Sequence, residues 1–255
     1  MRTICVINLK GGVAKTATTV NMAAILARCH KKHVLVVDGD SQANTSEFFA
    51  SQDVMPCTLT DALRGEPDGG KLAKLCIVQS NFPGIDLLPA DDRLMDLDLS
   101  QISGGKVYTD CLRDLKGLIS YDYVIIDCPP AFNAASAAAL IAADEVIIPI
   151  KLDAFSLRGM SNLMQQIANM RKLNPKLKLS GILPTMWYKS EKITEAMNVL
   201  LKSSLPVFLP IRRSNKVDDM TFAQKPLIVS SPHCGAAVKT PGAVFCTSCG
   251  RRLDE

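Results

Sequence analysis

A loop rich in glycine and lysine lies near the start of the chain, directly after a short apolar run. The run spans Thr3–Asn8, and the loop reads Lys10-Gly11-Gly12-Val13-Ala14-Lys15-Thr16. Glycines let backbone N–H groups converge on an anion, and a helix behind the loop adds the positive end of its dipole. Lys15 suits the β- and γ-phosphates, and the hydroxyl of Thr16 suits Mg²⁺. The pattern predicts a phosphate loop that binds MgATP; the alternative is a glycine-rich turn in which the lysines occur by chance.

Two positions of this loop depart from the standard phosphate loop. Leu9 and Ala14 stand where the standard form has glycine. A side chain is tolerated at either place if the residue has a negative φ. Lys10 is an additional lysine early in the loop.

Two aspartates end two further apolar runs. One run continues into Asp38-Gly-Asp40-Ser-Gln42, and the other ends in Asp127-Cys-Pro-Pro130. The carboxyl ends of parallel strands share the sheet edge where ligands of open α/β sheets bind. A carboxylate there can hold Mg²⁺, usually through water, or orient the attacking water. A lone aspartate at a strand end is more often a cap or turn former, but two such ends beside a phosphate loop favour a nucleotide site.

Short β-branched runs alternate with longer helical patterns along the chain. Several of the runs are continuously apolar, which is typical of parallel strands covered on both faces. The alternation predicts an α/β fold, a doubly wound and mostly parallel sheet flanked by helices. The expected strands are Thr3–Asn8, His33–Asp38, Ile85–Pro89, Tyr123–Asp127, Glu145–Ile150, Leu179–Pro184 and Pro206–Leu209, and the expected helices are Lys15–Cys29, Lys106–Ile119, Phe155–Leu173 and Glu191–Lys202.

The composition of the 255 residues excludes several classes of protein. A hydrophobic share of 47% is enough for a sizeable core, and a net charge of +4 excludes a polycation, so any nucleic-acid contact must come from a local patch. No apolar run approaches the roughly 18 residues of a membrane span. The first residues are interpreted as a strand rather than a signal peptide, which makes a cytoplasmic location the expectation. Six scattered cysteines are expected to be buried, reduced thiols: Cys5, Cys29, Cys57, Cys76, Cys111 and Cys128.

The composition changes after Pro226, which predicts an ATPase domain over residues 1–228 and a small tail over 229–255. The tail is too short for a hydrophobic core of its own, so it needs a staple or a docking surface. Cys246-Thr-Ser-Cys249 has the spacing of half a zinc ribbon, and Ser231-Pro-His-Cys234 has the shape of the other half with serine for the first cysteine. Three readings stay open: a Zn²⁺ ribbon held by Cys234, Cys246 and Cys249 with His233 as a candidate fourth ligand, a degenerate ribbon without metal, and an iron–sulfur or redox site.

The loop and the two acidic strand ends together resemble the ParA/MinD ATPases with a deviant Walker A motif, over roughly Met1 to Pro226. The resemblance implies a P-loop NTPase fold and residues 10–17, Lys10 to Ala17, around the nucleotide. It implies that Lys10 is the signature lysine that reaches the partner's nucleotide in an ATP-sandwich homodimer. It also implies that Asp40 positions the attacking water and that Asp127 is the Walker B acid, which holds the water shell of Mg²⁺.

Leu209-Pro-Ile-Arg-Arg-Ser-Asn-Lys216 followed by Lys225-Pro226 resembles the C-terminal signature of the partition branch of that family, with Arg212 where the family has proline. The resemblance implies that Ile211 and Arg212 border the adenine. It further implies nonspecific DNA binding and a weak ATPase stimulated by a ParB-like partner. The DNA-binding candidates are Arg212, Arg213, Lys216, Lys189 and Lys192, although on charge alone such a cluster can equally be a solvated rim.

Two rival functions remain. One is an iron–sulfur cluster carrier ATPase, since carriers share the deviant loop and can have a C-terminal C-x-x-C pair. The other is a membrane-associated positioning ATPase. The MinD branch would predict a C-terminal amphipathic helix, and the cysteine-rich C-terminus argues against it, so no membrane partner is expected.

Overall fold

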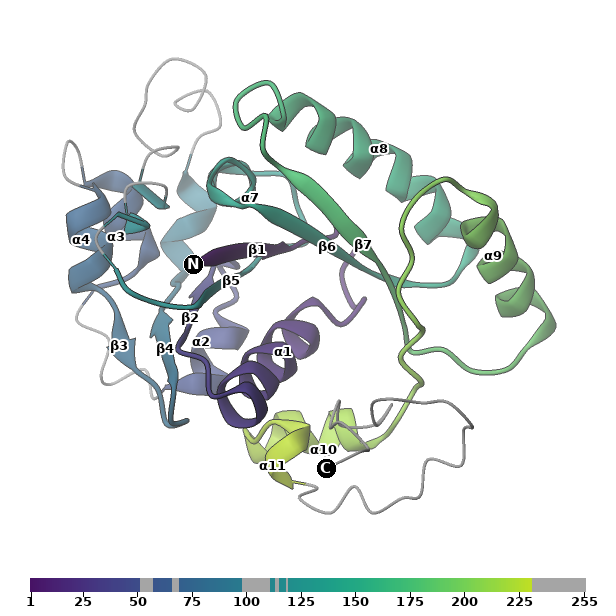
Figure 1. Ribbon diagram of the computed structural model, residues 1–255, viewed down its shortest axis with the longest axis horizontal. Helices are drawn as coiled ribbons and strands as arrows, with labels where there is room; N and C mark the ends of the chain where they lie inside the picture. Colours follow the sequence, from purple (N-terminus) through teal and green to yellow (C-terminus); the bar gives the residue numbers. More distant parts are fainter. Residues whose placement is uncertain (51–56, 66–68, 98–110, 113–114, 118, 231–255) are drawn as a thin grey trace.

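The continuous apolar runs form the centre of a single sheet. A computed structural model of the chain describes residues 1–50, 57–65, 69–97, 111–112, 115–117 and 119–230. Within them seven strands lie in the order β3-β4-β2-β5-β1-β6-β7 (Figure 1). The strands are β1 (Arg2–Val6), β2 (Val34–Asp38), β3 (Val78–Gln79), β4 (Ile85–Leu88), β5 (Tyr123–Asp127), β6 (Glu145–Lys151) and β7 (Lys178–Thr185).

All neighbouring strands in this sheet run parallel except β3, which pairs antiparallel with β4 at one edge. Strands β2 and β5 are in register over their full length, so that Asp38 lies opposite Asp127 at their carboxyl ends. The predicted fold class, a mostly parallel sheet flanked by helices, is therefore confirmed.

Helices cover both faces of the sheet, because alternate residues of each strand point to opposite sides. The helices are α1 (Lys15–His30), α2 (Asn44–Phe49), α3 (Leu59–Arg64), α4 (Gly69–Leu75), α7 (Ala134–Ala142), α8 (Ala154–Met170), α9 (Glu191–Lys202), α10 (Lys216–Ala223) and α11 (Leu227–Ser230), with a 3₁₀ turn over Asp92–Asp96. Val34 and Val36 pack on the side of α1, α2 and α10. Leu35 and Val37 pack on the side of α3, α4, α7 and α8 (Figure 1). In the described part of the chain no helix is long and apolar enough to cross a membrane.

Several predicted elements differ from the structure. Pro206–Leu209 is not a strand: only Val207 forms an isolated bridge, to Ile182 of β7. Pro206, the first residue of this segment, and Pro210, the residue after it, both lack the N–H group that would extend the hydrogen-bond ladder with β7. The helix predicted to end at Leu173 ends at Met170, where three turn residues follow. The predicted helix Lys106–Ile119 falls mostly outside the described residues.

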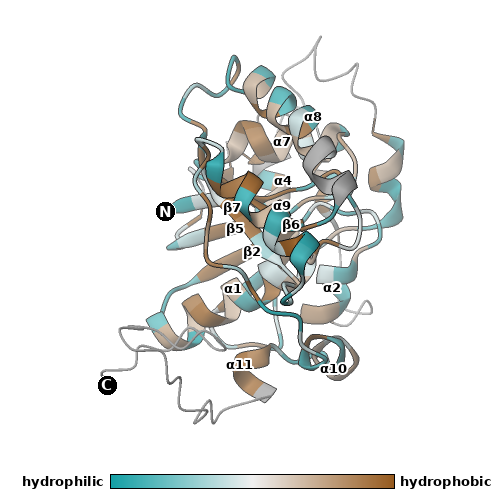
Figure 2. Cartoon of the chain, turned by 90° about the vertical axis from the view of Figure 1, so that its right-hand side faces the viewer, coloured by the Kyte–Doolittle hydropathy of each residue, from teal (hydrophilic) through white to brown (hydrophobic). Residues whose placement is uncertain are grey.

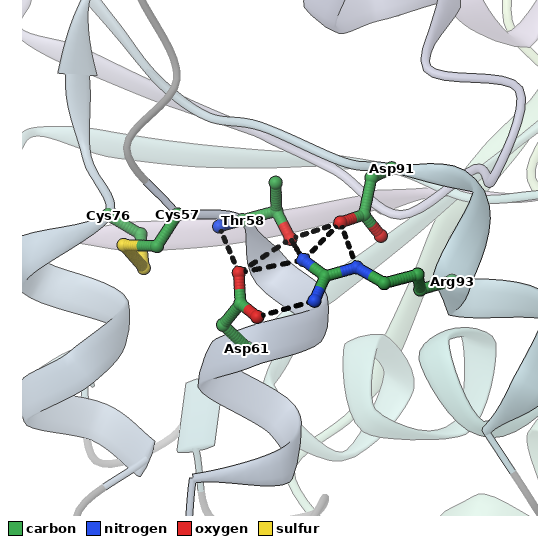
Figure 3. The surroundings of a disulfide bond; sticks show 6 residues. All are labelled: Cys57, Thr58, Asp61, Cys76, Asp91 and Arg93. Atoms are coloured by element: carbon green, nitrogen blue, oxygen red, sulfur yellow. Dashed lines mark hydrogen bonds and ion pairs between the residues drawn. A yellow bond between two sulfur atoms is a disulfide. The ribbon is translucent and has the colours of Figure 1, made fainter.

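The cysteines depart from the expectation of buried thiols at three positions. Cys5, Cys111 and Cys128 are buried and lie outside the disulfide, as expected, but Cys29 is an exposed thiol. Cys57 and Cys76 form a disulfide, because the packing of α3 against α4 brings their Cα atoms to 5.0 Å. This disulfide joins Cys57, two residues before α3, to Cys76, the residue after α4, beside a polar network of Thr58, Asp61, Asp91 and Arg93 (Figure 3).

Candidate active site

The candidate site is built from the loops that follow β1, β2 and β5 at one edge of the sheet. The loop Lys10–Thr16 leads directly from β1 into α1, as the sequence predicted. The edge strand β7 supports this loop: the hydroxyl of Thr185 in β7 donates to the carbonyl of Val13 at 3.0 Å. Val13 is 1% exposed, so this part of the loop is packed into the protein, while Gly11 and Gly12 before it are exposed.

Two residues of the loop adopt left-handed backbone conformations. Gly12 has a φ of 69°, which glycine adopts without cost, and Ala14 has a φ of 67°. Ala14 therefore does not meet the condition of a negative φ, while Leu9 is not among the residues with positive φ. Ala14 is the residue before α1, and its carbonyl accepts from both the N–H and the hydroxyl of Thr18. These bonds hold the alanine in a conformation that costs about 1–2 kcal/mol in an L-residue.

Lys15 is a cation held inside the protein. Its side chain is almost fully buried, and its ammonium donates to the carbonyl of Lys10 at 3.2 Å, across the mouth of the loop. Burial lowers the pKa of Lys15, while the charges of Asp127 and Asp40 act in the opposite direction. The loop therefore presents a partly desolvated positive charge, with two carboxylates close by, at the position predicted for the β- and γ-phosphates.

The ammonium group of Lys10 pairs with Asp153, the second residue after β6, at 2.5 Å. Its backbone N–H donates to the side-chain oxygen of Asn8, whose amide in turn donates to the carbonyl of Pro149 in β6. The start of the loop is thus fastened to β6 through both its backbone and its ammonium group.

Asp127 is the centre of the site. It is 1% exposed and accepts three threonine hydroxyls. Oδ2 accepts from Thr16 at 2.7 Å and from Thr45 at 2.6 Å, and Oδ1 accepts from Thr19 at 3.3 Å. Burial raises the pKa of Asp127, while the bonds from Thr45 and Thr16 and the charge of Lys15 oppose that change. The structure thus brings together Thr16 and Asp127, the two predicted magnesium residues.

Asp38 is a second buried carboxyl group, directly opposite Asp127 in the sheet. Oδ2 of Asp38 accepts from the N–H and the hydroxyl of Ser46, at 2.8 and 2.7 Å, and its Oδ1 accepts from the N–H of Asp40 at 3.1 Å. Burial raises the pKa of Asp38 to about 7, and the neighbouring charge of Asp127 adds to the rise.

Asp40 lies in the short connection between β2 and α2 and is partly exposed. Its side chain accepts from the N–H of Gln42 at 3.1 Å, and its carbonyl accepts from the N–H of Ala43 at 2.9 Å. Gly39 sets the approach to this turn: its N–H donates to the carbonyl of Asp127 at 2.8 Å, and a Cβ there would lie 2.9 Å from the same oxygen. The sequence therefore needs glycine between the two aspartates.

The predicted basic residues gather on another surface. An isolated parallel bridge pairs Trp187 with Arg212, so the connection after β7 and the segment before α10 lie side by side. The Arg212 guanidinium lies 5.8 Å from the centre of the Trp187 ring. Figure 2 looks onto this side of the molecule, with α9 and α10 in view. Arg212, Arg213, Lys216, Lys189 and Lys192 are all exposed, and the structure brings their two segments together. Ile211 is 46% exposed and donates its N–H to Pro184.

The three predicted zinc ligands, Cys234, Cys246 and Cys249, lie outside the described residues. Within the described part of the chain, no cluster of three or more histidine, cysteine, aspartate or glutamate side chains could hold a metal ion. The zinc site and the boundary at residue 228 therefore stay predictions.

Sequence reasoning missed several residues that surround the site. Asn8, Thr45, Ser46 and Asp153 each hold a predicted site residue or its partner by a hydrogen bond or an ion pair. Asn8 adjoins the loop and Ser46 follows an acidic strand end, so proximity in sequence was a signal for both. Asp153 had none, because only the position of β6 beside β1 brings it to Lys10.

Comparison with known proteins agrees with this geometry. A family model described as an AAA domain matches residues 1–179. The chromosome partitioning protein ParA of Caulobacter vibrioides is 32% identical over 245 residues, which cover 93% of this chain and 90% of that protein. ParA of Myxococcus xanthus is 33% identical, over 99% of this chain and 87% of that protein. The structure of a cobyrinic acid a,c-diamide synthase from Mycobacterium smegmatis with a bound ATP analogue and magnesium is similar with a TM-score of 0.74, at 28% identity over 92% of this chain and 97% of that chain.

Proposed function

Because the chain belongs to the ParA family of P-loop ATPases, we propose that it is a DNA partition ATPase. It dimerises around MgATP, binds DNA without sequence preference and releases it on hydrolysis. The observation that carries the ATPase part is the convergence of Lys15, Thr16, Asp40 and Asp127 at the carboxyl edge of β1, β2 and β5. The relatives' names support the role in partition.

Nucleotide binding rests on the loop Lys10–Ala17. Its backbone N–H groups and the first turn of α1 receive the phosphates, and the Lys15 ammonium leaves the carbonyl of Lys10 to meet their charge. Asp40, at the rim of the site, holds and orients the attacking water. Ile211 and Arg212 border the adenine at the far end of the nucleotide. A similar structure that holds an ATP analogue and magnesium, at 28% identity, supports nucleotide binding.

Magnesium fits the residues present. The Thr16 hydroxyl and the Asp127 carboxylate are hard oxygen donors 2.7 Å apart, the ligand type that Mg²⁺ prefers. Thr16 would ligate the ion directly and Asp127 would hold its water shell. When bound, the ion neutralises charge that develops on the phosphate oxygens. The Thr16 hydroxyl donates its hydrogen bond to Asp127, so the lone pairs of its oxygen stay available to a metal ion.

Dimerisation and DNA binding rest on other parts of the molecule. Lys10 would leave Asp153 and reach the nucleotide of the second subunit, in a homodimer that forms with ATP. The exposed cations at 189, 192, 212, 213 and 216 would then contact DNA phosphates, which gives affinity but no sequence preference. A ParB-like partner would stimulate the slow hydrolysis.

DNA binding in defined nucleotide states tests this proposal. The protein would be titrated against a labelled duplex with ADP, with ATP and with a slowly hydrolysed analogue. Binding with ATP and the analogue but not with ADP is expected. Equal binding in all three states would contradict a nucleotide-controlled DNA switch.

Two substitutions separate nucleotide binding from chemistry. Lys15→Ala should abolish ATP binding measured by calorimetry, because it removes the charge that faces the phosphates. Asp40→Ala should keep ATP-dependent dimerisation and lose hydrolysis, because a water-orienting group acts in the chemical step. Unchanged ATP affinity in Lys15→Ala would remove the phosphate-loop assignment, and loss of ATP binding in Asp40→Ala would make Asp40 a metal or structural residue.

Three further measurements on the same preparation test the rival functions and the metal content of the tail. Co-sedimentation with lipid vesicles would favour a membrane-associated positioning ATPase, and a brown chromophore after anaerobic reconstitution would favour an iron–sulfur carrier. One Zn²⁺ per chain by elemental analysis is the result that a zinc ribbon at Cys234, Cys246 and Cys249 requires. A metal-free protein that remains folded would favour a degenerate ribbon.

A further inference from the structure

Thr45 is a buried hydroxyl that the proposed chemistry does not use. It is 0% exposed, lies in the first turn of α2, and donates to Oδ2 of Asp127 at 2.6 Å. We propose that Thr45 is a positioning residue: its hydroxyl links the Asp127 carboxylate to the segment that carries Asp40. A change in what Asp127 binds then changes how firmly that segment is held. The inference rests on the proposed ATPase function and names a control of the same site.

The first step of the argument is the shared oxygen. Oδ2 of Asp127 accepts two hydroxyls from two different elements, Thr16 from α1 and Thr45 from α2. One carboxylate oxygen has about two lone-pair directions, and both are occupied by these donors. Any further donor that approaches this oxygen must therefore displace one of them. The bond from Thr16 joins the carboxylate to the phosphate loop, and the bond from Thr45 joins it to α2, which follows the turn that carries Asp40.

The second step is the connection from Thr45 to Asp40. Between them the chain makes a tight turn, in which the N–H of Ala43 donates to the carbonyl of Asp40 and Ala43 has a φ of 52°. The next residue after Thr45, Ser46, binds Asp38 through its N–H and its hydroxyl. Segment 40–43 is thus held at its start by β2 and at its end by two neighbouring side chains, each attached to one of the two buried carboxyl groups.

The two bonds that hold the end of this segment, from Ser46 to Asp38 and from Thr45 to Asp127, join it to different parts of the site. Asp38 is 0% exposed, and its partners are the backbone and side chain of its own connection, so the bond to Ser46 holds α2 against β2. Asp127 lies beside Lys15 and Thr16, where the phosphates and the metal are expected. Of these two bonds, only the Thr45 bond therefore joins α2 to the nucleotide side of the site. Its loss would leave the turn that carries Asp40 attached to Asp38 through Asp40 and Ser46, without the bond to Asp127.

Hydrogen exchange of the α2 amides tests this inference in Thr45→Val, which keeps the shape and removes the hydroxyl, and in Thr45→Ser, which keeps the hydroxyl. In the nucleotide-free protein, Thr45→Val should speed exchange over Asn44–Phe49 about tenfold or more, as expected for the loss of a hydrogen bond to a charged group. Thr45→Ser should exchange like the unmodified chain. Unchanged exchange in Thr45→Val would overturn the proposal, whether or not the protein acts on DNA.

The coupling itself is tested by comparing ATP with EDTA and ATP with Mg²⁺. The unmodified chain and Thr45→Ser should change their α2 exchange when Mg²⁺ is supplied, and Thr45→Val should lose that response while still binding ATP. A full response in Thr45→Val would contradict the link. Hydrolysis should follow the same pattern, with kcat lowered in Thr45→Val more than KM is raised, and restored in Thr45→Ser.

Thr60→Val is the matched control. Thr60 is also a fully buried threonine, and its hydroxyl donates to Asp91 at 2.5 Å, on α3 rather than α2. Removing it should leave the α2 response to Mg²⁺ intact. If Thr60→Val abolished the response as well, general loosening of the fold would explain both variants and the Thr45 link would be rejected. If the unmodified chain failed to bind ATP, the phosphate-loop assignment would fail, while the nucleotide-free arm would still decide the role of Thr45.

Discussion

The ammonium group of Lys10 lies 2.5 Å from a carboxylate oxygen of Asp153 in the same chain. The two side chains are 37% and 31% exposed, so solvent screens this ion pair. A lysine that acts on a second subunit's nucleotide must first leave this partner. Because exposed pairs contribute only about 0.2–1 kcal/mol, the pair can hold the lysine in the monomer without preventing its release.

The first prediction concerns this release. Lys10→Ala should bind ATP as a monomer and fail to form the ATP dimer, because it lacks the cation that crosses the interface. Asp153→Asn should favour the dimer by about two- to thirtyfold in its dissociation constant, because a symmetric dimer releases two exposed ion pairs of about 0.2–1 kcal/mol each. Light scattering over a range of protein concentrations with ATP measures both. A normal ATP dimer in Lys10→Ala would contradict a lysine acting in trans.

The second prediction concerns the pH dependence of stability. The pKa of Asp38 is raised to about 7 in the folded protein, mainly by burial, from an ordinary value near 3.8. The folded state therefore binds this proton more tightly, and the contribution to stability is present below about pH 4 and lost as pH rises towards 7. Between pH 4.5 and 7.5 the free energy of unfolding should decrease less in Asp38→Asn than in the unmodified chain, with a difference of roughly 2–4 kcal/mol at most.

Urea unfolding at a series of pH values measures that slope. Asp96→Asn is the control, because it also removes one carboxylate, but at a side chain that is 73% exposed. It should keep the slope of the unmodified chain. The absolute stability of Asp38→Asn can fall, since its amide N–H₂ faces donors from Ser46 or Asp40, so the comparison is one of slopes. An unchanged slope would show that Asp38 is ionised throughout this range.

The phosphate loop and the strand ends were predictable because their signals are local. Lys15, Thr16 and Asp127 were each identified from a strand followed by a loop, and the parallel register of β1, β2 and β5 brings them together. The left-handed conformation of Ala14 could not be predicted, because glycine is the usual residue there and bonds from Thr18 to the Ala14 carbonyl hold the alanine in it.

Contacts set by packing between distant elements could not be predicted. Cys57 and Cys76 have no local signal for pairing, since their approach depends on the angle between α3 and α4. The Ala-rich helix α7 was also missed. All nine of its residues are buried, so it has no polar face to reveal a helical period.

The third prediction concerns the disulfide. It closes a loop with a sequence separation of 19, for which a chain-entropy model gives about 3 kcal/mol. Replacing both Cys57 and Cys76 with alanine should lower the free energy of unfolding by about 2–3 kcal/mol in oxidising buffer. In buffer with a thiol reductant the difference should shrink, because the unmodified chain then also lacks the crosslink. Cys29→Ala, at a free and exposed cysteine, should change stability in neither buffer. A difference that persists undiminished in reductant would assign the effect to packing.

The last prediction concerns the basic surface formed by the segments around Trp187 and Arg212. Replacing Arg212 and Arg213 with glutamate should weaken binding to two unrelated duplexes alike, because phosphate contacts carry no sequence information. It should also flatten the dependence of affinity on salt, by about 0.9 in the logarithmic slope for each DNA phosphate that the protein no longer neutralises. ATP binding should survive, since the phosphate loop lies elsewhere and Arg212, which stacks on Trp187, only borders the adenine.

Lys172→Glu with Lys176→Glu is the matched control for this surface. Both lysines are exposed and precede β7, at the opposite edge of the sheet from Arg212, which lies beyond the carboxyl end of β7. Each double variant lowers the net charge of +4 to zero, so an effect of total charge would weaken DNA binding equally in both. The ATP-state proteins would be titrated at several salt concentrations. Loss of affinity only in the variant at Arg212 and Arg213 assigns DNA binding to this surface. If that variant binds DNA as tightly as the unmodified chain, the two arginines are only a solvated rim, and the DNA-binding assignment moves to Lys189 and Lys192.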